Sequence, residues 1–256
     1  MYSSFRLILD FYFISIKGLR KIFAYFAFLI ITFQIIAYLH VLSEIFLSLT
    51  YLFTWILLVA IFLPIQLAIH ELGHINKMRF KFQANKFFVE QQGALGAMIV
   101  SDYKFNNVNE IEILEAPYLG KFFLTMFVID LIKYVFAIYF ALLSPFWWIM
   151  LPAVLVFFYR FIEYITTLII LYWKVFPPKR SKLAPILSSL GIGSDIVGIA
   201  YFKGIRIPEY WEKTFDNVYS QDSYQIISQE LQEGKRKILR EAGEFIFVTK
   251  KNSINN

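Results

Sequence analysis

The segment FLPIQLAIHELGHINKM, residues 62–78, decides how the rest of the chain is interpreted. It closes a long apolar run and carries His70, Glu71 and His74. In an α-helix, residues four apart lie on one face, so the two imidazoles can converge on one metal ion while Glu71 stands beside them. Ionisable groups inside a membrane span are costly and usually functional. The segment therefore predicts a metal site at the end of an apolar helix.

The composition predicts an α-helical polytopic membrane protein. Of the 256 residues, 58% are hydrophobic, and the mean hydropathy is +0.57, far above that of an ordinary soluble domain. Several stretches exceed the roughly 20 apolar residues needed to cross about 30 Å of hydrocarbon. The net charge of +6 lies mostly beside the ends of apolar runs, which favours orientation in a bilayer over nucleic-acid binding. The absence of cysteine excludes disulfides and thiolate ligands.

We expect about four to five membrane segments, preceded by an interfacial segment at residues 1–21. The spans are expected at residues 22–42, 51–74, 117–143 and 146–173, and a glycine-rich run at 185–202 either crosses or re-enters the membrane. The link between the first two spans has no Lys or Arg, whereas both spans are basic at their other ends. By the positive-inside rule, the N-terminus faces the cytoplasm and the protein is multi-pass in the cell membrane.

Two less apolar regions complete the organisation. Residues 78–109 contain RFKFQANKFFVE and ALGAMIVSDYKF, separated by Gln91-Gln92-Gly93, which predicts a β-hairpin at the membrane surface. An exposed edge of that hairpin could bind an extended substrate by β-addition, and a plain connecting loop is the alternative. Residues 203–256 form a soluble C-terminal tail with a predicted helix around 225–240. Residues 22–202 are thus expected to form the membrane domain.

The pattern at residues 70–74 is the H-E-x-x-H arrangement of zinc hydrolases. Imidazole suits Zn²⁺, which keeps a water at its open position and lowers the pKa of that water towards neutrality. Glu71 is expected to be the general base that takes the proton of the water. Gly73 removes a side chain where a substrate or another helix must approach, and Gln66, one turn before His70, either holds a ligand or packs between helices.

A third metal ligand is expected from a later apolar run. Asp130 has Lys133 three residues on, and Glu163 has Arg160 three residues before, so each can be neutralised on its own helix. Asp195 has no cation three or four residues away, and an unpaired buried carboxylate needs a partner that a metal would supply. The residues favour Asp195 and leave Glu163 as the alternative.

The chain resembles the site-2 protease family of intramembrane zinc metalloproteases. The resemblance lies in the apolar helix that ends in His70-Glu71-Leu72-Gly73-His74, the hairpin-like segment after it, and Ala116-Pro117 at the start of the next span. The segment from Gly193 to Gly198 also looks like the Ser/Gly-Asp motif of smaller bacterial relatives. The family implies an aspartate from a later segment as third ligand, which would be Asp195.

The resemblance implies a zinc metalloendopeptidase that hydrolyses a membrane-associated protein or peptide precursor within or near the bilayer. Its cofactor would be Zn²⁺, held by His70, His74 and Asp195, with Glu71 as general base. Two other functions stay open: a non-catalytic metal-binding membrane protein, such as an immunity factor or transporter, and an endopeptidase that opens to the cytoplasm with a glutamate as third ligand. The lipid bilayer is the other expected partner, and the sequence leaves the oligomeric state open.

Overall fold

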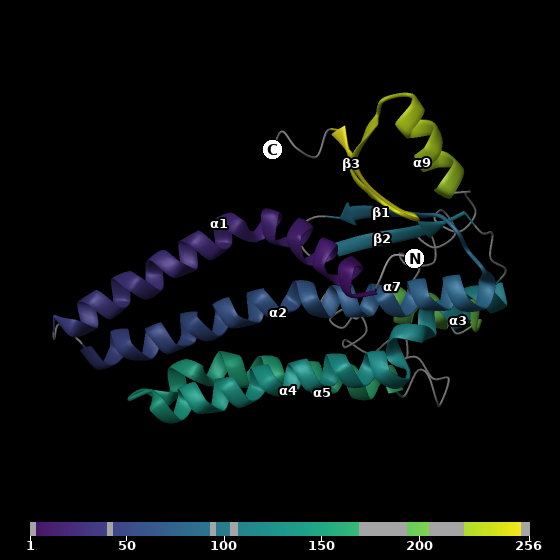
Figure 1. The fold of residues 1–256 in the computed structure, drawn as a ribbon. Helices are drawn as coiled ribbons and strands as arrows, with labels where there is room; N and C mark the ends of the chain where they lie inside the picture. Colours follow the sequence, from purple (N-terminus) through teal and green to yellow (C-terminus); the bar gives the residue numbers. More distant parts are fainter. Residues whose placement is uncertain are drawn as a thin grey trace.

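A computed structural model of the chain describes residues 4–39, 43–92, 96–102, 107–168, 194–204 and 223–251. Within these ranges the structure is mostly helical, with one small sheet. The long helices α1 (Ser4–Tyr38) and α2 (Ser43–Phe82) pack side by side, and α4 (Gly120–Leu143) lies on the other side of α2. The sheet covers the C-terminal part of α2 (Figure 1).

Three stretches of the described residues are long and apolar enough to cross a membrane: Arg20–Tyr38, Ser43–Phe82 and Asn109–Leu143. They agree with the first three predicted spans. The fourth predicted span begins with the short helix η2 (Trp147–Met150) and continues as α5 (Leu151–Leu168), while its last residues lie outside the described part. Of the glycine-rich run, residues 194–202 form the nine-residue helix α7 (Ser194–Phe202), and the rest lies outside the described part.

Buried polar side chains connect α2 to α4. Lys133 Nζ lies 2.5 Å from an Asp130 carboxylate oxygen, as the spacing of these two residues predicts. The same ammonium donates to Gln66 Oε1 at 2.6 Å, and Gln66 Nε2 donates to the Met126 carbonyl at 3.2 Å. Trp55 Nε1 donates to the Lys133 carbonyl at 3.0 Å. Gln66 therefore packs between α2 and α4 with both of its amide atoms hydrogen-bonded. This avoids the free-energy cost of burying an unsatisfied amide.

The predicted hairpin is confirmed, and it is part of a larger sheet. Strands β1 (Phe87–Gln92) and β2 (Gly96–Ser101) pair antiparallel, and β1 begins eight residues after the start of the run RFKFQANKFFVE. Before it, α2 continues to Phe82. The C-terminal strands β3 (Arg236–Ala242) and β4 (Phe245–Lys250) extend the sheet to four strands in the order β2-β1-β4-β3, with β1 and β4 parallel.

The predicted helix over residues 225–240 is wrong in its second half. Helix α9 (Ser223–Gln232) ends before Gly234, which has a φ of +70° and so takes the left-handed conformation typical of a residue just after a helix. Strand β3 begins two residues later at Arg236. Pairing of β3 with β4, and of β4 with β1, joins the C-terminal tail to the hairpin, which the sequence pattern does not predict.

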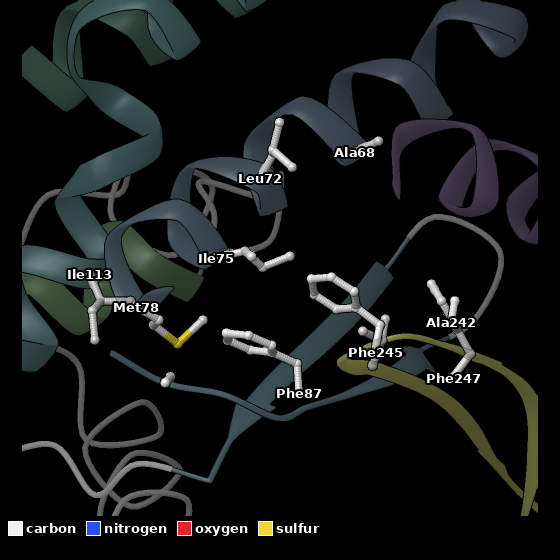
Figure 2. Close-up of a cluster of buried hydrophobic side chains, with 11 residues drawn as sticks. Ala68, Leu72, Ile75, Met78, Phe87, Ile113, Ala242, Phe245 and Phe247 are labelled. Atoms are coloured by element: carbon white, nitrogen blue, oxygen red, sulfur yellow. The ribbon is translucent and has the colours of Figure 1, made fainter. Parts of the chain in front are cut away.

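An apolar core lies between α2 and the sheet. Leu72, Ile75 and Met78 of α2 face Phe87 of β1 and Phe245 of β4 (Figure 2). The rings of Phe87 and Phe245 stack, with their centroids 5.1 Å apart. The strands on this face and the helix therefore stabilise each other, and the sheet fixes the part of α2 that carries the predicted site.

This core yields a prediction for stability. Truncation of the fully buried side chain in Phe245→Ala leaves a cavity under α2, and it should cost about 3–5 kcal/mol. The measurement is the apparent melting temperature of the purified protein in detergent, compared with the exposed control Gln225→Ala. Equal melting temperatures for the two variants would contradict the role given to the tail in the fold.

Candidate metal centre

Three of the predicted site residues converge on one point. His70 and His74 come from adjacent turns of α2, and Asp195 comes from the first turn of α7. Asp195 Oδ2 lies 2.7 Å from His70 Nε2 and 3.1 Å from His74 Nε2, and the two Nε2 atoms are 3.3 Å apart. A group with this geometry could hold a metal ion.

The donor chemistry at this point fits a cation. His74 Nδ1 lies 2.8 Å from the Ile113 carbonyl oxygen, which can only accept, so Nδ1 carries the hydrogen. In the neutral ring, Nε2 of His74 then presents a lone pair towards His70 Nε2 and the Asp195 carboxylate. Tetrahedral coordination at about 2.0–2.1 Å separates ligand atoms by about 3.3 Å, close to two of the three observed distances.

Glu71 lies beside this group without joining it. Its side chain is only 7% exposed. The charges of His70, His74 and Asp195 act on its carboxylate. Its role as a general base stays a prediction.

Helix α3 (Asn107–Glu115) contacts both α2, which carries the histidines, and α7, which carries Asp195. Its Ile113 carbonyl accepts the hydrogen bond from His74, and Glu115 at its end forms an ion pair with Lys203, just after α7. Ile199 of α7 is fully buried where α7 packs against α3. The position of Asp195 therefore depends on α3, a helix that the sequence analysis does not identify.

Two further residues near the centre were missed by the sequence analysis. The Tyr118 ring meets the His70 ring edge-on, with centroids 5.4 Å apart. Glu110, in the first turn of α3, interacts electrostatically with His74. Their nearness to the histidines depends on how the chain folds back after the sheet, and no local pattern reveals it.

Gly73 gives the close approach that the sequence predicts at this position. A Cβ atom there would lie 2.8 Å from Pro117 Cα and 3.0 Å from Pro117 N, too close for real atoms. Pro117 belongs to the short helix η1 (Ala116–Tyr118), which also carries Tyr118. The glycine therefore lets η1 lie against the helix turn between His70 and His74.

The remaining predicted site residues are placed as follows. Asp130 pairs with Lys133 and packs between α2 and α4. Glu163 lies on α5, and its side chain is outside the part of the chain that the structure describes. Gly193, the first residue of the quoted Ser/Gly-Asp segment, lies outside it as well.

Comparison with protein-family models, with curated proteins and with solved structures finds no match to this chain.

The contact at Gly73 can be tested directly. Alanine is the better helix former, so Gly73→Ala would stabilise an isolated helix by roughly 1 kcal/mol. Here the added Cβ must displace η1, because its closest contacts are backbone atoms. We expect a lower melting temperature for Gly73→Ala than for wild type, with Ile61→Ala, on an exposed position of α2, as control. A melting temperature above wild type would contradict the close approach.

Proposed function

We propose that the protein is an intramembrane zinc metalloprotease that hydrolyses peptide bonds of a membrane-associated protein or peptide precursor. The observation that carries the proposal is the convergence of His70, His74 and Asp195 on one point. The histidines and the buried Glu71 belong to α2, a helix apolar enough to cross a membrane. A buried acid next to a group of metal-ligand type is the combination that hydrolytic metal sites require.

Zinc is the metal that suits this group. Two imidazoles and one carboxylate are the ligands of several catalytic zinc sites, which keep the fourth position open. His74 also has the supporting hydrogen bond that ligating histidines usually make through their other ring nitrogen. When bound, Zn²⁺ would supply Lewis-acid activation of a water and of the peptide carbonyl.

The residues of the chain have distinct parts in the reaction. His70, His74 and Asp195 would hold the metal. Glu71 accepts a proton from the attacking water and donates it to the nitrogen of the leaving amine. The buried surroundings of Glu71 keep bulk solvent away, which strengthens the electrostatic interactions of this carboxylate.

The sheet suggests how a substrate is presented. A transmembrane helix hides its amide bonds, so hydrolysis requires an extended segment. Strand β2 stands at the edge of the sheet and packs near α2. An extended segment could add to β2 as a further strand, which would use the main-chain groups of that edge.

The ligand set is tested by metal content. Asp195→Asn should lower zinc affinity by more than about 100-fold, because loss even of a supporting residue costs about 10–100-fold. Glu163→Gln should leave zinc content near one ion per chain. The measurement is zinc per purified chain during titration with a chelator. The opposite pattern would favour the endopeptidase with a glutamate ligand.

The catalytic role of Glu71 is tested with Glu71→Gln. The amide cannot accept the proton, so cleavage should fall by about 10²–10⁴-fold or more while zinc content is kept. The assay follows cleavage of quenched, palmitoyl-anchored peptides in liposomes, with Glu44→Gln, exposed at the other end of α2, as a control.

Failure of this test has a clear meaning. Full cleavage by Glu71→Gln would contradict the mechanism. Complementation in cells by the same variant, with zinc still bound, would instead point to a non-catalytic metal-binding membrane protein.

A further inference from the structure

Strand β3 carries two exposed apolar side chains. Ile238 and Leu239 are 46% and 43% exposed. Among the described residues of the sheet and α9, the other large hydrophobic side chains are less exposed. Leu239 has no partner on β4, because the pairing shifts between Ile238 and Arg240. A bulge of this kind re-aims side chains and protects an edge strand from further pairing.

Exposed cations lie near this bulge. Five exposed basic residues lie on the β3–β4 hairpin and directly beside it, against two exposed acids, Glu233 and Glu241. The basic residues are Lys235, Lys237, Arg240, Lys250 and Lys251. The pairing places Arg236 opposite Lys250, so most of these charges gather at one end of the hairpin. An exposed apolar bulge next to a basic end of the hairpin is suited to an anionic lipid surface.

One ion pair places the bulge near the expected membrane surface. Arg240, directly after Leu239, pairs with Asp10 of α1. Asp10 is buried, and this burial raises the pKa of its carboxyl, an effect that Arg240 opposes. The candidate span of α1 begins at Arg20, ten residues later, which is about 15 Å along a helix. The headgroup layer extends about 5–7 Å beyond the hydrocarbon, so it lies between the start of this span and Asp10.

We propose that the β3 bulge is a membrane anchor, in which Ile238 and Leu239 insert into the headgroup region of an anionic bilayer and the surrounding lysines bind lipid phosphates. The anchor would hold the sheet, and with it β2, against the membrane surface. It does not rest on the proposed protease activity, and the same behaviour is expected of the protein without metal.

The experiment uses the absence of native cysteine. Leu239→Cys in the full chain is labelled with an environment-sensitive NBD fluorophore, and the protein is placed as a single copy in nanodiscs. The discs contain phosphatidylcholine alone or mixed with phosphatidylglycerol, and doxyl-labelled lipid serves as quencher. Leu142→Cys, 80% exposed on α4, is the positive control, and Gln225→Cys, exposed on α9, is the negative control.

We expect quenching at residue 239 to be at least about twofold stronger in the anionic discs than in the neutral ones. Lys237→Glu combined with Lys251→Glu should return it to the neutral level. Quenching at residue 239 that is no greater than at residue 225 would overturn the anchor. Quenching at residue 239 that changes neither with lipid charge nor with the charge-reversal substitutions would overturn it too. In a parallel sample of larger discs that hold two copies, burial of the residue 239 label that is absent with one copy would assign the surface to a second chain and overturn the anchor as well. Lack of quenching at residue 142 would overturn the membrane assignment together with the anchor.

Discussion

The hydrogen bond from His74 Nδ1 to the Ile113 carbonyl joins the histidine-bearing turn of α2 to α3. It sets the tautomer of the ring, so that Nε2 turns its lone pair towards His70 Nε2 and the Asp195 carboxylate. It also holds α3 against α2. Glu115 of α3 pairs with Lys203, just after α7. Helix α3 therefore holds α7 where Asp195 reaches His70, a residue far away in the sequence.

The parts of the centre that depend on helical spacing could be predicted from the sequence. His70 and His74 lie one turn apart, so their convergence follows from the periodicity of α2 alone. Asp130 and Lys133 pair for the same reason. Asp195 could be selected because no cation on its own helix neutralises it, and an uncompensated charge in apolar surroundings is costly.

The parts that depend on contacts between distant segments could not be predicted. The parallel pairing of β1 with β4 joins residues near 89 to residues near 247, and neither strand alone indicates its partner. The error in the predicted tail helix has a similar cause. Arg236 to Ala242 contains residues compatible with a helix, and pairing with β4 makes it a strand. Gly234 was the local signal that the helix ends earlier.

The centre and the apolar core divide the surface of α2 between them. Successive residues of a helix turn by about 100°, so the residues that pack on the sheet lie roughly opposite His70 and His74. Glu71 and Gly73 then lie on the two borders between these faces. At one border, Gly73 admits the backbone of η1 and closes the helix against it. At the other border, Glu71 stands between the histidines and the residues that pack on the sheet, so its carboxylate is enclosed from both sides.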